Sequence, residues 1–244
     1  MSGVLAVTRR ELRGYFLTPV AYVVIIVYLI LANVFAFYLG NFYERGQADL
    51  ASFFTFQPWL FLFLAPALSM RLWAEERRSG TIELLMTLPL ELWQSVLGKF
   101  LAVWAFTCIA IALTFPLWIT VNYLGNPDNG AILAGYVGSA LLVGGFLAVG
   151  AFISAMTKNQ VIAFVLSVVA CFLLLLAGYP LVLDAFAAWA PQAVVDGVAS
   201  LSFLTHFDSI SRGVIDLGDL IYFALLIGCC LYANTVMLQL TKAD

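Results

Sequence analysis

Six long apolar stretches constrain this chain more than any other feature of its sequence. They cover approximately residues 20–40, 53–70, 98–122, 131–156, 160–183 and 219–240. A helix needs about 20 mostly apolar residues to cross roughly 30 Å of hydrocarbon. With 64% hydrophobic and 10% charged residues, the chain also has more apolar side chains than a soluble core of 244 residues holds. We therefore expect an all-α polytopic membrane protein with six transmembrane helices, forming a single transmembrane domain over residues 1–244.

The positions of lysine and arginine predict how the chain is oriented. Cytoplasmic loops carry an excess of these residues, so the richer side is the cytoplasmic one. If the N-terminus is cytoplasmic and six spans follow, both termini lie in the cytoplasm, and Arg45 and Arg212 are the two basic residues on the outer side. The nine on the cytoplasmic side are Arg9, Arg10, Arg13, Arg71, Arg77, Arg78, Lys99, Lys158 and Lys242.

Two regions outside the spans have helical patterns of their own. Residues 1–17 are typical of an amphipathic interfacial helix, with Leu5, Leu12 and Phe16 on one face. Residues 184–218 form an outer segment that is too polar to span a membrane and too apolar for a solvated loop. We expect short helices there, which lie on the outer leaflet or dip into it.

The chemistry that the spans lack narrows the class of protein. Apart from Lys99 and Asp219 near their ends, the six stretches contain no Asp, Glu, Lys, Arg or His. Carriers coupled to protons usually place such groups near the membrane midplane, so this class is disfavoured. Sodium coupling through broken helices stays open, with Pro66 and Pro116 as the candidate breaks, although tolerated kinks are the commoner outcome for such prolines.

Enzyme, metal and nucleotide sites are disfavoured as well. The four cysteines lie inside apolar stretches without metal-ligand spacing, and His206 is typical of a solvated or interfacial histidine rather than a ligand. The pair Gly98-Lys99 lacks the earlier glycine of a phosphate-binding loop, so an ATP site has to lie on another chain. We expect no metal, no catalytic residue and, with a net charge of −3, no nucleic-acid partner.

The cytoplasmic loop at residues 71–97 carries the clearest positive signal. Its segment RLWAEERRSGTIELLMTLP, residues 71–89, gathers charges in a chain that otherwise has few. Ser79 or Thr81 is suited to cap a second helix near Gly80. A short amphipathic helix at a membrane surface is suited to docking a soluble partner. A solvated loop whose arginines only enforce topology explains the same residues, so both interpretations stay open.

Two segments resemble those of a known family. Residues 75–89, EERRSGTIELLMTLP, resemble the signature E-(K/R)-x-x-G-T-(L/I)-E-x-L-L-x-x-P of ABC-2-type transporter permeases. Residues 203–219, FLTHFDSISRGVIDLGD, resemble the segment before the last helix in the gliding-motility-type and nitrous-oxide-maturation-type permeases. The resemblance covers essentially the whole chain. It implies a subunit of the bacterial cytoplasmic (inner) membrane with an N-terminal connecting helix, a cytoplasmic coupling helix and outer re-entrant helices.

The same resemblance implies partners and residue roles. ATP and magnesium are expected on cytoplasmic ABC ATPase subunits, and no cofactor on this chain. A homodimer or a pair with a second permease-like subunit is expected, in contact with membrane lipids and, in one variant, with a periplasmic auxiliary protein. The residues implied in ATPase coupling are Glu75, Glu76, Arg77, Arg78, Ser79, Gly80, Thr81, Glu83, Leu84, Leu85, Thr157, Lys158 and Asn159. Those implied in the connecting helix are Arg9, Arg10 and Arg13, and those implied in an outer gate are His206, Phe207, Arg212 and Gly213.

Other classes of function stay in view. A membrane scaffold that holds partner proteins without moving cargo has the same spans and the same loop, and an ion-coupled carrier is a weaker alternative. The uncharged spans favour an amphiphilic cargo, or force transmission to a partner protein, over a charged small molecule. Ala140, Gly144 and Ala148 are spaced four apart, which allows helices to approach closely, either within the chain or between two copies.

Overall fold

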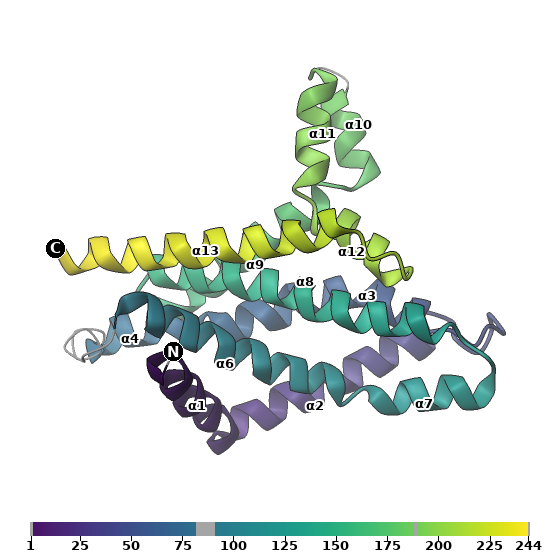
Figure 1. Ribbon diagram of the computed structural model, residues 1–244, viewed down its shortest axis with the longest axis horizontal. Helices are drawn as coiled ribbons and strands as arrows, with labels where there is room; N and C mark the ends of the chain where they lie inside the picture. Colours follow the sequence, from purple (N-terminus) through teal and green to yellow (C-terminus); the bar gives the residue numbers. More distant parts are fainter. Residues whose placement is uncertain (1, 82–90, 188–189, 244) are drawn as a thin grey trace.

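The chain folds into a bundle of helices (Figure 1). The computed structural model describes residues 2–81, 91–187 and 190–243, and every regular element within these ranges is a helix. In chain order they are α1 (Ser2–Leu17), α2 (Pro19–Val34), the π-helix η1 (Phe35–Leu39), α3 (Ala51–Ser69), α4 (Arg71–Ser79), α6 (Leu92–Ala112), α7 (Phe115–Leu124), α8 (Asn129–Met156), α9 (Gln160–Leu176), α10 (Pro180–Ala187), α11 (Gln192–Ser200), α12 (Phe203–Ser211) and α13 (Leu217–Ala243).

Helix α8 is the central element of the bundle. It contacts α3, α4, α6, α9, α12 and α13, and most of its side chains are buried. Asp128 starts it, because its carboxylate accepts hydrogen bonds from the backbone N–H groups of Gly130 and Ala131. Gly144 allows α6 to approach, since a Cβ there would lie 3.1 Å from Nε1 of Trp104. The stripe of small residues is therefore a packing seam within the chain.

Several helices are long and apolar enough to cross a membrane. Among the described residues they are Pro19–Leu39, Ala51–Ser79, Leu92–Leu124, Asn129–Met156 and Leu217–Leu240. This makes the chain a multi-pass membrane protein. The other predicted span corresponds to α9, whose 17 residues lie at the lower limit for a spanning helix. Helix α9 ends at Leu176 rather than at residue 183, because Pro180 disfavours helical backbone before it and begins α10 instead.

The two prolines singled out in the sequence behave differently. Pro116 accompanies a break, since the chain turns at Leu113 and Thr114 and restarts as α7 with this proline in its first turn. Pro66 lies inside α3, which continues through it to Ser69. The third predicted span also begins earlier than residue 98, because α6 starts at Leu92, within the segment predicted as loop.

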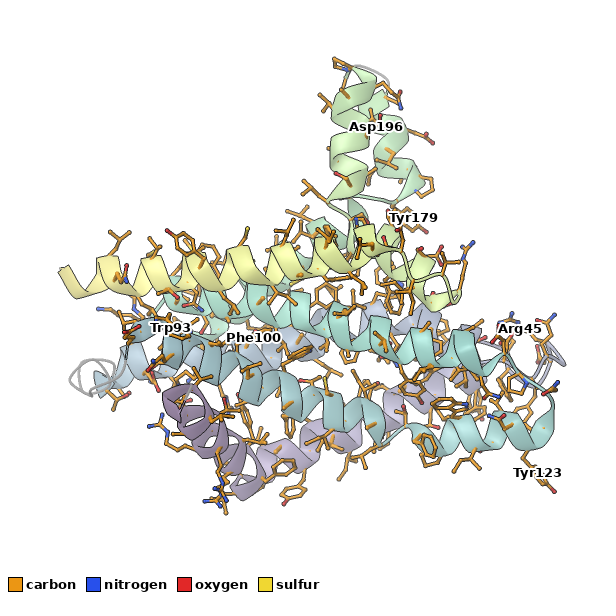
Figure 2. All side chains as sticks on the ribbon, viewed as in Figure 1. Arg45, Trp93, Phe100, Tyr123, Tyr179 and Asp196 are labelled. Atoms are coloured by element: carbon orange, nitrogen blue, oxygen red, sulfur yellow. The ribbon has the colours of Figure 1, made fainter. Side chains whose placement is uncertain are left out.

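The segment predicted to lie on the outer side, residues 184–218, forms short helices, and two helices of this region leave the bundle. Helices α10 and α11 pack against each other and project sideways, whereas α12 lies against α8 and α13 (Figure 1). Tyr179 lies at the base of this projecting pair and Asp196 farther out (Figure 2). Both termini lie toward the end of the bundle that carries α4, here called the α4 end (Figure 1). Arg45 and Tyr123 lie at the opposite end (Figure 2).

Candidate functional site

Helix α4 contains the first part of the charged motif. It ends because Gly80 adopts a left-handed conformation, with φ of 73°, which favours glycine at this position. The Ser79 hydroxyl donates to the carbonyl of Glu75 at 2.9 Å and so closes the last turn of α4. Arg77 and Arg78 lie in that turn, where the helix dipole favours positive charge.

One side chain of α8 holds the junction between α3 and α4. The Ser154 hydroxyl accepts hydrogen bonds from the backbone N–H groups of Trp73 at 3.2 Å and Ala74 at 3.1 Å. It also donates to the carbonyl of Met70 at 2.9 Å. A hydroxyl has one donor and two acceptor positions, and all three are used here. The backbone of the turn between α3 and α4 is therefore hydrogen-bonded to a side chain of α8.

Close packing brings α8 to this junction. A Cβ on Gly150 would overlap the Oγ of Ser69, the last residue of α3, so glycine is required for the observed approach. Ser69 itself is fully buried. The α3–α4 junction is therefore fixed both by hydrogen bonds and by the shape of α8.

The C-terminal part of α4 contacts the end of α8. The guanidinium of Arg77 donates to the carbonyl of Ala155 in the last turn of α8. The tight turn follows at once: the Thr157 hydroxyl accepts from the N–H of Asn159, whose side chain caps α9. The predicted turn residues, Lys158 included, thus lie at the α4 end, where α4 contacts both α8 and α9.

A buried lysine connects α4 with two other helices. Lys99 of α6 is 4% exposed, and its Nζ lies 2.6 Å from Oε1 of Glu76 and 3.8 Å from Oε1 of Glu11. The same ammonium donates to the carbonyl of Leu72 at 3.2 Å and lies 5.1 Å from the centre of the Trp73 ring. A buried charge needs such partners, because desolvation alone is costly. Lys99, Glu76 and Glu11, here called the Lys99 cluster, join α1, α4 and α6.

Helix α1 has the bounds expected of the interfacial helix but a different buried face. Val4 and Val7 are buried, whereas Leu5 is 66% exposed, so the prediction for Leu5 is wrong. The reason is the contact with α6: a Cβ on Gly98 would lie 2.7 Å from Cβ of Val7, and the Thr8 hydroxyl bonds the carbonyl of Gly98 at 3.2 Å. The other two residues predicted on that face pack against the core.

The arginines of the predicted connecting helix lie on the outside of α1. Arg9, Arg10 and Arg13 are all exposed. Arg10 donates to Glu11 at 2.5 Å, so it also contacts a member of the Lys99 cluster. Helix α1 itself packs on α6 and α2.

A second polar cluster lies where α11, α12 and α13 meet. Nδ1 of His206 lies 2.6 Å from Oδ1 of Asp219, and its Nε2 lies 3.0 Å from the carbonyl oxygen of Ser200. The Tyr222 ring stacks on the imidazole with 3.9 Å between centroids, and its hydroxyl donates to the carbonyl of Leu201 at 2.7 Å. His206, Asp219 and Tyr222 are called the His206 cluster. With its side chain 18% exposed and paired, His206 is not a solvated histidine.

The other residues of the predicted outer gate lie apart from this cluster. Phe207 is buried, close to α8, and Arg212 is exposed and pairs with Asp208 at 2.5 Å. Gly213 has a positive φ of 89° and lies against Ala131. The four predicted gate residues therefore share a region but not one site. Within the described residues, no group of His, Cys, Asp and Glu is suited to hold a metal ion.

The α4 end brings together most of the residues predicted to couple to an ATPase. Glu75 to Thr81 and the turn at Thr157 to Asn159 lie there together. Glu83, Leu84 and Leu85 lie outside the described residues. Whether these residues bind an ATPase stays a prediction.

Sequence reasoning missed three residues that build this end. Ser154 and Glu11 were not predicted, and Lys99 was given only a role in orientation. A serine inside an apolar stretch has no periodic signal. Lys99 did give a signal, because a charged residue inside a predicted span is expected to have a partner.

Comparison with known proteins adds a finding that is independent of the geometry. Residues 20–240 match the family model described as ABC-2 family transporter protein. No curated protein matches the chain. The matched range begins within α2 and ends within α13, so it includes the charged motif, α4, α6 and α8, but not α1.

Proposed function

The chain belongs to the ABC-2 transporter family, and from this membership we propose that it is the transmembrane permease subunit of an ABC transporter. Members of this family are membrane transport components and are not themselves catalytic. In our proposal, ATP and magnesium bind to separate cytoplasmic ATPase subunits. Helix α4 and the turn at residues 157–159 receive the ATPase, and its closure moves the bundle.

One observation carries this assignment of α4. Side chains bond this short helix to α1, α6 and α8 through the Lys99 cluster, Ser154 and Arg77. A displacement of α4 therefore has to be shared by three helices of the bundle, which is what a coupling element requires. A solvated loop that only enforces topology has no need of such bonds.

The proposal includes the arrangement in the membrane. The α4 end faces the cytoplasm of a bacterium, both termini lie on that side, and α9 supplies the sixth crossing of the inner membrane. The chain forms a dimer with itself or with a second permease-like subunit, and the resemblance of residues 203–219 supports membership of the gliding-motility and nitrous-oxide-maturation subgroup. The apolar spans favour an amphiphilic cargo, or force transmission to a periplasmic auxiliary protein.

Exposed residues of α4 provide the test. The chain is co-expressed with each ABC ATPase of its own genome, and co-purification and ATP turnover are measured. Arg78→Glu reverses an exposed charge on α4, and Gly80→Ala opposes the left-handed end of this helix. Both variants are expected to lower ATPase binding and turnover without loss of the folded bundle. Arg212→Glu, at an exposed arginine near Ala131, is the matched control.

The outcomes separate the alternatives. Unchanged co-purification and turnover in both α4 variants overturn the role of α4. If an ATPase binds through α4 but no cargo moves in reconstituted liposomes and no periplasmic partner responds to ATP, the chain is a scaffold. Transport that persists without any ATPase assigns it to the ion-coupled carriers.

A further inference from the structure

A crevice lies beside the Lys99 cluster, between α1, α2, the end of α3 and α4. Its volume is about 410 Å³, within the range of small-molecule pockets. One part of its wall is apolar and comes from Ala21 and Val24 of α2 and Leu68 of α3. The other part is charged and comes from α4, α1 and Lys99. The crevice thus has one apolar wall and one charged wall.

Two groups of the charged wall have no ion-pair partner in the part of the chain that the structure describes. Arg71 and Glu75 both line the crevice, one helical turn apart on α4, yet they form no ion pair with each other or with any other described residue. Residues four apart on a helix are neighbours, with about 5–6 Å between their Cβ atoms. Within the described residues, Arg71 therefore lacks an acceptor and Glu75 lacks a donor, at adjacent points of one wall.

Glu76 also has a carboxylate oxygen without a hydrogen-bond partner among the described residues. Its Oε1 is held by Lys99 at 2.6 Å, but its Oε2 is buried without a hydrogen-bond partner among the described residues. A buried carboxylate oxygen left without a donor is destabilising. Lys99, at 4% exposure, is already satisfied by its own contacts and does not supply that donor. Among the described residues, the wall therefore presents one unpaired cation, Arg71, and one unpaired carboxylate, Glu75, beside a carboxylate that is paired through one of its oxygens.

We propose that this crevice binds a phospholipid whose headgroup carries both a phosphate and a primary ammonium. The phosphate pairs with Arg71, the ammonium donates to Glu75, and an acyl chain lies along Ala21, Val24 and Leu68. A headgroup of this type separates its two charges by a two-carbon link, which suits groups one helical turn apart. The inference concerns a bound lipid and does not depend on what the protein transports.

Two further features favour a lipid over a soluble protein partner. The apolar wall belongs to helices that are themselves candidate membrane spans, so it lies next to the bilayer rather than to the aqueous phase. Tyr15 also lines the crevice, and burial, followed by the nearby Glu11, raises the pKa of its phenol above the usual range. This phenol therefore stays protonated, as a hydrogen-bond donor.

Gly14 allows the site to be blocked without damage to the fold. It lines the crevice, and a Cβ built on it meets no atom within 4 Å. Gly14→Leu is therefore expected to fill the crevice while leaving the helix intact, since leucine is the better helix former. Gly197→Leu in α11 is the matched control, because a Cβ on Gly197 also meets nothing within 4 Å and lies outside the crevice.

The experiment is a lipid titration of the delipidated protein, followed by native mass spectrometry. Phosphatidylethanolamine, phosphatidylcholine and phosphatidylglycerol with identical acyl chains are compared, because only the first offers both a phosphate and N–H donors. The wild type is expected to retain one phosphatidylethanolamine at least about tenfold more strongly than the other two. Gly14→Leu should abolish that retention and Gly197→Leu should not.

Variants of the charged wall assign the headgroup. Arg71→Gln is expected to weaken binding of phosphatidylethanolamine by about tenfold, and Glu75→Gln should reduce its advantage over phosphatidylcholine. Thermal unfolding confirms that each variant is folded. Equal retention of the three lipids, or retention unchanged in Gly14→Leu, overturns the proposal.

Discussion

The Lys99 cluster and the His206 cluster each join a basic side chain to a carboxylate, but they hold different parts of the molecule. Lys99 is 4% exposed and joins three helices, with partners 23 and 88 residues away in the chain. His206 and Asp219 are 18% and 12% exposed, and they are 13 residues apart. The first cluster therefore fixes the packing of the bundle, and the second fixes the base of the projecting helices α10 and α11.

The two clusters also differ in how many additional contacts surround them. At the α4 end, Ser154 and Gly150 add a second set of contacts between α8 and the α3–α4 junction. At the base of the projecting helices, Tyr222 adds a single hydrogen bond to the carbonyl of Leu201. Loss of one side chain should therefore have a global effect at the α4 end and a local effect near His206.

The largest effect is expected from Lys99→Met. This change leaves the carboxylate of Glu76, 20% exposed, without its cation, and the free energy of unfolding should fall by about 3 kcal/mol. Thermal unfolding in detergent checks this. The double variant with Glu76→Leu should recover much of the loss, because an apolar pair replaces the buried ion pair. A Tm no lower than that of Lys158→Met would contradict a structural role for the cluster.

Gly150→Ala should have the next largest effect. The new methyl group overlaps Ser69, and overpacking of this kind costs about 1–3 kcal/mol. The same thermal unfolding assay measures it. Adding Ser69→Ala should restore part of the stability, since the overlapping oxygen is removed. Gly197→Ala is the control, as a Cβ there meets nothing within 4 Å, and a loss as large in that variant would show that packing at α8 is not the cause.

Asp219→Asn should act locally. It removes the charged partner of His206 while keeping a similar shape, at a cost of about 1–2 kcal/mol. We expect faster amide hydrogen exchange in α11 with little change in exchange at α4 and α8. Equal acceleration in all three helices would mean that the two clusters are not independent.

Tyr222→Phe should have the smallest effect. It removes the hydrogen bond to the carbonyl of Leu201 and retains the ring on His206, so the expected cost is about 1 kcal/mol. Amide exchange at residues 192–200 is the measurement. If exchange there rises more than in Asp219→Asn, the tyrosine rather than the ion pair holds the base of α11.

Local signals allowed much of the fold to be predicted. The bounds of α1 follow from its amphipathic pattern and from Pro19, and α8 begins within two residues of its predicted start because Asp128 caps it. The short helices before α13 follow from apolar residues at helical spacing. The break at Thr114 and the early end of α9 were missed. Thr114 lies two residues before Pro116 and Leu176 lies four residues before Pro180, both inside apolar runs.

The candidate site was less predictable, for a physical reason. The motif at Glu75 to Thr81 is visible in the sequence, but the groups that hold it in place come from distant helices. Ser154 bonds to residues about 80 positions away, and Glu11 meets Lys99 only after α1 folds onto α6. Such pairings depend on tertiary packing, which leaves no periodic trace in the sequence.

The length of α8 has a mechanical consequence. With 28 residues and about 1.5 Å of rise per residue, this helix is about 42 Å long, more than the roughly 30 Å of a hydrocarbon core. Its last turn holds α4 through Ser154 and Arg77, and Gly138, in its first half, lies against α12. Pivoted at one end, a lever arm of this length that tilts by about 5° carries its far end through about 4 Å. In our proposal, a small rotation at α4 is thereby converted into a displacement as wide as an atomic contact at the far end of α8.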